Sequence, residues 1–130
     1  MAAVNIINAT SIYGKSTFYT PGGTTAMVLL TNAASSSTVM KINEITAANT
    51  TGSLATTTVS MYTNGAVAQG SLPSGGTAYP IVGTLSVPAN TSMVVSDKSS
   101  AFYLEENMSI SVTSGTSSAI TYTISYELMA

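Results

Sequence analysis

The sequence of 130 residues contains no cysteine, no histidine, no tryptophan and no arginine. The absence of cysteine excludes a disulfide framework and a cysteine-based zinc site. The absence of histidine removes the side chain that most often carries acid–base chemistry at neutral pH. The absence of arginine, together with a net charge of −2, argues against nucleic-acid binding, which needs clustered cations on the phosphates.

Charge of either sign is scarce. Only 6% of the residues are charged, against about 25% in ordinary soluble domains, whereas serine and threonine make up about a third of the chain. Hydroxyl and amide groups therefore supply most of the polar surface. Because few charges give little repulsion between copies, this composition favours association and residence in an assembly. A Ser/Thr-rich monomeric secreted β-domain is the alternative interpretation.

Long apolar runs are missing as well. No window approaches the 18 apolar residues of a membrane-spanning helix, and residues 1–8 lack the basic and apolar segments of a secretory signal. We therefore expect no membrane partner. The length suits one domain over residues 1–130, which would bury roughly two-thirds of the surface of the unfolded chain. Residues 1–20 are expected to form an N-terminal arm or an edge strand.

The strongest positive signal is the alternation of apolar and polar residues near the C-terminus. In residues 108–112, Met, Ile and Val alternate with Ser, and in residues 120–128, Ile, Tyr and Leu alternate with Thr, Ser and Glu. A period of two predicts half-buried strands. The turn-forming segment 115–118 between the two runs predicts that they pair as an antiparallel hairpin.

Further strand signals run through the chain, at residues 26–30, 39–45, 57–62, 81–87, 93–95 and 102–104. The alternation slips near Asn43, which indicates a β-bulge. Asn64-Gly65 predicts a tight turn, and the glycine-rich segment 69–78 predicts a loop. The fold class is therefore all-β: a single antiparallel β-sandwich of about eight strands, with jelly-roll or immunoglobulin-like topology.

Candidate catalytic groups are few. The acidic residues are Glu44, Asp97, Glu105, Glu106 and Glu127. In a strand, the adjacent Glu105 and Glu106 would point to opposite faces, and only at a turn could they converge on an ion or a substrate. Asp97-Lys98-Ser99 could hold a Ser–Lys catalytic pair if Lys98 were desolvated, but a turn in which Asp97 accepts from backbone amides is favoured. We predict no catalytic, cofactor-binding or metal-ligating residue.

Two glycine pairs and four glycosylation sequons receive structural interpretations. Gly22-Gly23 and Gly75-Gly76 lack the lysine and the following helix of a phosphate-binding loop, and they are interpreted as turns or edge loops. In a chain without a recognisable signal peptide, the Asn-X-Ser/Thr sequons are expected to arise by chance. They lie at Asn8, Asn49, Asn90 and Asn107.

The aromatic residues fall into two groups. Tyr122, Tyr126 and Phe102 lie on apolar faces and are expected in the core or in a subunit interface. A second group lies around Gly14-Lys15-Ser16, and it either anchors an N-terminal arm on a neighbouring subunit or consists of ordinary strand residues. This group is Tyr13, Phe18 and Tyr19.

Seven short segments occur in order over residues 38–127. They are Lys41-Ile42-Asn43-Glu44-Ile45, Val59-Ser60-Met61-Tyr62, Val87-Pro88-Ala89-Asn90-Thr91-Ser92-Met93-Val94-Val95, Asp97-Lys98, Tyr103-Leu104-Glu105-Glu106, Ser109-Ile110-Ser111-Val112 and Ser125-Tyr126-Glu127. The series resembles a group of small β-sandwich structural proteins of tailed bacteriophages, including cyanophages. That group usually has Gly-Asp where this chain has Asn107-Met108. Because asparagine tolerates the positive φ that glycine adopts, the turn is expected to survive.

The resemblance implies a non-enzymatic virion structural protein, first of all a capsid decoration (cement) protein on the capsid exterior. Its partners would be the major capsid protein or other virion proteins, and its copies would form a homo-oligomer, for example a trimer, after synthesis in the host cytoplasm. The alternative is a neck, tail or fibre component that contacts a host receptor or glycan. A small enzyme such as a glycan hydrolase is a third reading, against which the missing histidine and the separated acids argue.

Overall fold

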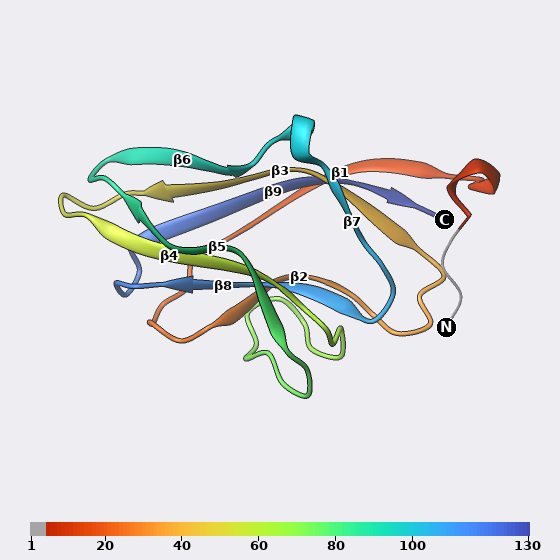
Figure 1. The fold of residues 1–130 in the computed structure, drawn as a ribbon, viewed down its shortest axis with the longest axis horizontal. Helices are drawn as coiled ribbons and strands as arrows, with labels where there is room; N and C mark the ends of the chain where they lie inside the picture. The colour runs from red at the N-terminus through yellow and green to blue at the C-terminus, as the bar shows by residue number, and fades with distance from the viewer. Residues whose placement is uncertain (1–4) are drawn as a thin grey trace.

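The computed structural model describes residues 5–130, which form two packed antiparallel β-sheets (Figure 1). This part of the chain contains nine strands and two short 3₁₀ helices, η1 (Ile6–Asn8) and η2 (Lys98–Ser100). The predicted all-β sandwich is therefore confirmed, with nine strands instead of about eight. The strands are β1 (Ile12–Tyr19), β2 (Met27–Asn32), β3 (Val39–Asn49), β4 (Ala55–Tyr62), β5 (Ala78–Val87), β6 (Thr91–Ser96), β7 (Phe102–Leu104), β8 (Met108–Ser114) and β9 (Ile120–Met129).

The strand order selects one of the two topologies left open by the sequence. Sheet A has the order β1-β9-β3-β6, with β7 also paired to β3, and sheet B has the order β2-β8-β4-β5. Strands β6 and β7 share one position, because β6 pairs with residues 45–49 of β3 and β7 with residues 40–42. The chain crosses between the sheets at every connection except β4–β5 and β6–β7. This wrapping of two four-position sheets is that of a jelly roll.

The predicted hairpin between residues 108–112 and 120–128 is wrong. Strand β8 pairs with β2 and β4 in sheet B, whereas β9 pairs with β1 and β3 in sheet A. The segment 115–118 therefore carries the chain from one sheet to the other. Alternation identifies the buried face of each strand, but that face is the same whether two strands lie side by side or oppose each other across the core.

The predicted tight turn at Asn64-Gly65 is also wrong. Both residues lie in the long connection 63–77. The last pair of the β4–β5 ladder before this connection is Tyr62 with Ala78. Gly65 serves a packing role instead, because a Cβ added there would lie 2.3 Å from the carbonyl oxygen of Asn32. Of the loop predicted for residues 69–78, residues 69–77 lie in this connection and Ala78 begins β5.

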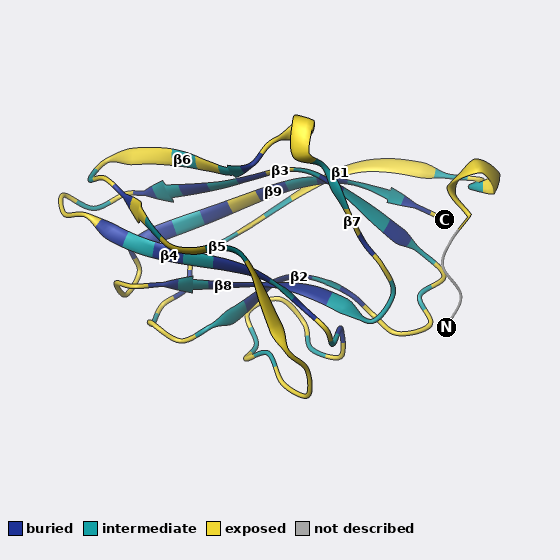
Figure 2. Cartoon of the chain, in the orientation of Figure 1, coloured by how far each residue is buried: buried dark blue, intermediate teal, exposed yellow. Residues whose placement is uncertain are grey.

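The core lies between the sheets and is built by the alternating residues of the sequence (Figure 2). In β9, Ile120, Tyr122 and Ile124 are fully buried, and Tyr126 is nearly so, while Thr123 between them is exposed. The core position predicted for Tyr122 and Tyr126 is thus confirmed, and Phe102 is half-buried against the same cluster. The predicted bulge is confirmed as a register shift between Ile42 and Glu44 in the β3–β9 ladder.

Tyr122 connects the two sheets through its hydroxyl group. The hydroxyl donates to the backbone carbonyl of Thr113 on β8 at 3.1 Å, and it also bonds the hydroxyl of Thr57 on β4. Burial raises the pKa of Tyr122 to about 12, and the bond with Thr57 opposes that rise. The phenol is therefore a neutral hydrogen-bonding group in the core.

Two buried asparagines hold the loops at the sheet ends. Asn32 donates through Nδ2 to the carbonyls of Thr38 and Leu104, both at 3.0 Å. Asn49 donates in the same way to the carbonyls of Ser53 at 2.7 Å and Val87 at 3.0 Å. Both amides replace backbone partners that the crossing loops cannot supply, so their burial carries little cost.

Candidate interaction surface

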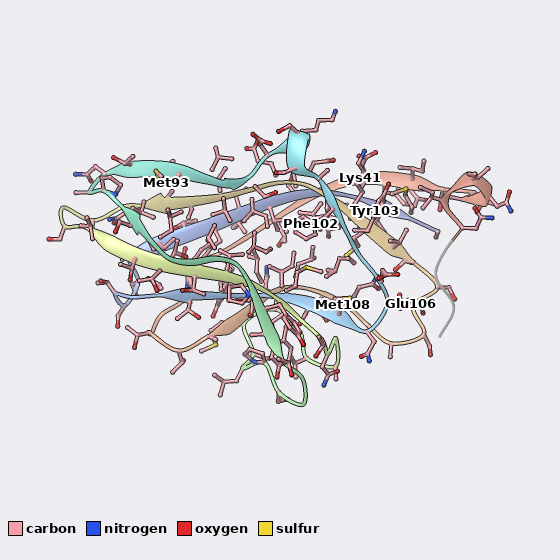
Figure 3. All side chains as sticks on the ribbon, viewed as in Figure 1. Lys41, Met93, Phe102, Tyr103, Glu106 and Met108 are labelled. Atoms are coloured by element: carbon pink, nitrogen blue, oxygen red, sulfur yellow. The ribbon has the colours of Figure 1, made fainter. Side chains whose placement is uncertain are left out.

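The adjacent acids lie at the turn between β7 and β8 and do not converge. Glu105 is exposed, whereas Glu106 accepts a hydrogen bond from the backbone N–H of Ser37 at 3.1 Å and ties this turn to the β2–β3 loop. Figure 3 shows Glu106 beside Met108 at the turn. Within residues 5–130, no three His, Cys, Asp or Glu side chains gather as a metal site would require.

The Asp97-Lys98-Ser99 segment forms a capped turn. Asp97 is the N-cap of η2, and its Oδ1 accepts from the Ser99 backbone N–H at 3.0 Å and from the Ser99 hydroxyl at 2.5 Å. The hydrogen bond from the Ser99 side chain, helped by that from its backbone, lowers the pKa of Asp97. The Ser99 hydroxyl is thus directed at the carboxylate and not at Lys98, which leaves a Ser–Lys pair without its nucleophile.

The glycine pairs lie in loops. Gly22 and Gly23 lie in the β1–β2 connection with open space around them. In the 63–77 connection, Gly75 has a φ of +75°, and Gly76 donates its N–H to the Tyr62 hydroxyl at 3.0 Å. Neither pair precedes an α-helix. Both pairs therefore lie in loops, within the expected alternatives of turns or edge loops.

The sequon asparagines include several with a clear structural role. Asn107 adopts a φ of 59°, as expected for a residue replacing glycine, and its Oδ1 accepts from the Gly65 N–H at 3.2 Å. Asn90 also has a positive φ, 54°, in the β5–β6 turn. Asn49 is buried and its amide is already hydrogen-bonded. Asn8 lies in η1.

The N-terminal aromatic residues belong to an edge strand. Residues 12–19 form β1, which pairs with β9 along its whole length. Tyr13 and Phe18 are exposed, whereas Tyr19 is half-buried and packs on Gly70. Residues 1–4 of the expected arm lie outside the described residues.

A regular surface of strands is formed by the face of sheet A that points away from the core, which we call the outer face. One row crosses all four strand positions: Phe18 lies opposite Thr123, Thr123 opposite Thr46, and Thr46 opposite Val94. The two ends of the row are apolar and open to solvent, since Phe18 is 72% and Val94 57% exposed. The next row, Thr121, Ala48 and Ser92, is also uncharged.

The charges of the outer face gather towards its other end. Glu44 lies in the row of Ser125, and Lys41 lies opposite both Glu127 and Tyr103. Figure 3 shows Lys41 and Tyr103 close together at this end. Glu127 accepts from the Asn43 amide at 3.0 Å. The outer face is therefore divided into an uncharged half with exposed apolar groups and a half that carries three charges.

A shallow open hollow of about 370 Å³ lies where the end of β3 meets the β5–β6 turn. Its lining is polar but uncharged, and the Asn49 amide there is already committed to backbone carbonyls. The hollow therefore offers uncharged hydroxyl and amide groups to a ligand. It is lined by Ala48, Asn49, Thr50, Asn90, Thr91 and Ser92.

None of the helices in residues 5–130 is long and apolar enough to cross a membrane.

No protein-family model and no curated protein matches the chain. Among solved structures, it matches a chain from the structure of infectious bursal disease virus Gt strain, with a TM-score of 0.37 and 11% sequence identity. The match covers 93% of this chain and 29% of the virus chain. The present chain thus spans less than a third of the length of that chain.

Proposed function

We propose that this chain is a non-enzymatic structural protein of a tailed-bacteriophage virion, and that it acts as a capsid decoration (cement) protein. The observation that carries the proposal is the uncharged half of the outer face, where hydroxyl groups lie between the exposed Phe18 and Val94. The ordered segments that resemble phage β-sandwich proteins support the same assignment. A jelly roll is compatible with the role and does not itself decide it.

The proposed mechanism is mechanical. The chain would bind the major capsid protein through many weak apolar and hydrogen-bonded contacts repeated over the lattice of the head. Repetition converts weak single contacts into lasting attachment, because each further contact of a bound oligomer is intramolecular. A chain in which only 6% of the residues are charged suits this role, because few ions have to be desolvated when its surface is covered.

The number of copies per virion tests the proposal. A decoration protein follows the capsid lattice and is expected at hundreds of copies, whereas a neck, tail or fibre component is expected at tens or fewer, on the order set by symmetry. Quantitative mass spectrometry of purified particles measures this number. Fewer than about fifty copies would reject decoration and favour the neck, tail or fibre role.

A matched pair of lysine substitutions tests the surface. Val94 lies on the outer face and Leu72 in the 63–77 connection, and their exposed fractions are nearly equal, 57% and 59%. Val94→Lys should reduce incorporation into particles at least several-fold, because a buried unpaired charge is costly. Leu72→Lys adds the same charge elsewhere and should be incorporated normally. Equal incorporation of the two variants would exclude the outer face as the contact.

The enzymatic alternative has a direct test at the remaining acidic pair. Replacing Glu105 and Glu106 together by glutamine keeps the side-chain size and removes both carboxylates. Under the structural proposal, the double variant is incorporated into particles normally. Its stability falls modestly, because the charged acceptor of the Ser37 N–H at position 106 is lost. Loss of a measurable hydrolytic activity of the particles in this variant would instead support an enzyme.

A further inference from the structure

We infer that the free edge of β1 is a self-association surface, on which a second copy of this chain adds its own β1 in antiparallel orientation with Gly14 on the two-fold axis. The inference concerns the edge of sheet A and does not depend on the proposed virion role. Strand β1 occupies the end position of its sheet. Figure 2 shows much of this strand exposed.

The hydrogen-bond phase of β1 is set at its start. Ser11 and Ala130 exchange both backbone hydrogen bonds, at 3.2 and 3.1 Å. Doubly bonded pairs alternate along an antiparallel ladder, so the odd-numbered residues of β1 bond to β9 and the even-numbered residues point away from it. Phe18 agrees with this phase, since its carbonyl accepts from the Gln69 side chain at 3.5 Å. Ile12, Gly14 and Ser16 thus direct their N–H and C=O groups to the open edge.

The other edges of the two sheets are protected. The β2 edge is covered by the 63–77 connection, where Val28 exchanges backbone bonds with Ser71 and Gly70, both at 2.9 Å. Strand β5 contains Pro80 and two register shifts in its pairing with β4. Strand β6 has a register shift in its pairing with β3, and η2 separates it from β7, which has only three residues.

These protections are the devices by which sheets avoid edge pairing. Residues 12–16 of β1 have none of them: this stretch contains no proline and no register shift. Within residues 5–130, no hydrogen bond from outside the β1–β9 ladder reaches its backbone.

A second β1 is complementary to the first in one register. With Gly14 opposite Gly14, Ile12 lies opposite Ser16 of the second copy. The N–H and C=O groups of all three residues at the open edge therefore meet N–H and C=O groups that are also free to bond. The same register places Lys15 opposite Tyr13 of the second copy, twice by symmetry, on the face that carries Tyr126 and Leu128. Neighbours across strands lie about 5 Å apart, a distance that permits a cation–π contact.

The neighbouring registers are disfavoured. Centring the axis on Tyr13 would place Lys15 opposite Ser11 of the second copy and lose its contact with Tyr13. A shift that centres the axis on Lys15 would place the two lysines directly opposite each other, which is repulsive. A shift to Ser16 would place Gly14 opposite Phe18, whose carbonyl already accepts from Gln69. Lys15, the single charge on β1, thus selects a register and does not merely block the edge. The product is a two-fold dimer, in which the outer faces of both copies form one continuous surface.

The purified full chain tests association first. Sedimentation equilibrium should show a mass that rises with concentration towards twice the 13.2 kDa of one chain. Gly14→Pro removes the central N–H donors without touching the β1–β9 bonds, because that N–H points outwards. It should raise the dimer dissociation constant at least ten-fold. Gly14→Ala is the control, since an added Cβ meets nothing within 4 Å, and it should dimerise normally.

Disulfide trapping tests the register and does not depend on the folding of the proline variant. The chain has no cysteine of its own. Under mild oxidation, Gly14→Cys should form a covalent dimer. Ser16→Cys should not, because the two Ser16 positions are about 13 Å apart along the paired strands, beyond the roughly 7 Å limit for a disulfide.

Three results would overturn the inference. One is a single-chain mass at every concentration up to about 1 mM, where an interaction of roughly 4 kcal/mol would be visible. Another is a dimer that Gly14→Pro leaves intact. The third is efficient crosslinking of Ser16→Cys in place of Gly14→Cys. All three are measured on purified protein, so a failure here is distinct from a failure of the virion assignment.

Discussion

The hydroxyl of Tyr122 on β9 donates to the carbonyl of Thr113 on β8, 3.1 Å away in the opposite sheet. The bond runs through the core, where Tyr122 has no solvent exposure. Two sheets held by apolar contacts alone could slide against each other, whereas a directional bond specifies one alignment. Thr57 on β4 shares the same hydroxyl and extends this link to a second strand of sheet B.

Tyr122→Phe should destabilise the protein by about 1–3 kcal/mol, because the buried Thr57 hydroxyl and the part-buried Thr113 carbonyl lose a hydrogen-bond partner. Thermal unfolding followed by circular dichroism should show a melting temperature lower by several degrees. Adding Thr57→Val to this variant should cost less than the sum of the two single changes, since both partners of one bond are then absent. Full additivity would show that the two hydroxyls are not coupled.

Alkaline pH should weaken the fold through the same residue. Burial holds the pKa of Tyr122 at about 12 in the folded state, against about 10 in the unfolded chain. The stabilisation from keeping the phenol neutral is therefore complete below pH 10 and is lost progressively as the pH rises towards 12. Chemical denaturation at pH 9 and pH 11.5 should show this loss, reaching roughly 2 kcal/mol at pH 11.5. Tyr122→Phe should lose less over the same interval.

Ile124→Asp should prevent folding, whereas Thr123→Asp should be tolerated. The two residues are neighbours on β9, but Ile124 is fully buried and Thr123 is exposed on the outer face. An unpaired carboxylate in the core costs more than the typical stability of a domain of this size can absorb. At position 123 the cost should be about 1 kcal/mol, from strand preference alone. Cooperative unfolding of soluble Ile124→Asp would contradict the assigned core; Ile110→Asp on β8 provides the same test in sheet B.

Gly65→Ala should destabilise the 63–77 connection. The new methyl group would lie 2.3 Å from the Asn32 carbonyl oxygen, so the backbone has to move at a cost of about 1–3 kcal/mol. Gly52→Ala is the matched control, because a Cβ there meets nothing within 4 Å. Denaturant titration should separate the two variants. Equal stability would show that the loop adapts without strain.

Features that depend on local sequence were predictable. The alternation in residues 120–128 identifies the buried side of β9. In residues 39–45, the slip of the alternation near Asn43 identifies the β3 bulge. The positive φ expected at Asn107 is observed. Each of these depends on residues a few positions apart, for which side-chain period and backbone preference are sufficient.

Features that depend on distant partners were not predictable from one sequence. The hairpin between β8 and β9 was predicted wrongly, because alternation does not show whether two strands are neighbours in one sheet or face each other across the core. The buried asparagines Asn32 and Asn49 were missed because their partners, such as Leu104 and Val87, lie 72 and 38 positions away. The outer face likewise required the register of four strands before Phe18 and Val94 could be placed in one row.

The bond pair between Ser11 and Ala130 holds the end of β9 beside the start of β1 at one end of the sandwich (Figure 1). A peptide fused before Ser11 or after Ala130 would therefore emerge from the same place, beside the start of β1. Cargo attached at either end would leave the uncharged half of the outer face clear. The fold thus offers one attachment point, reached from two directions, for displaying a foreign sequence.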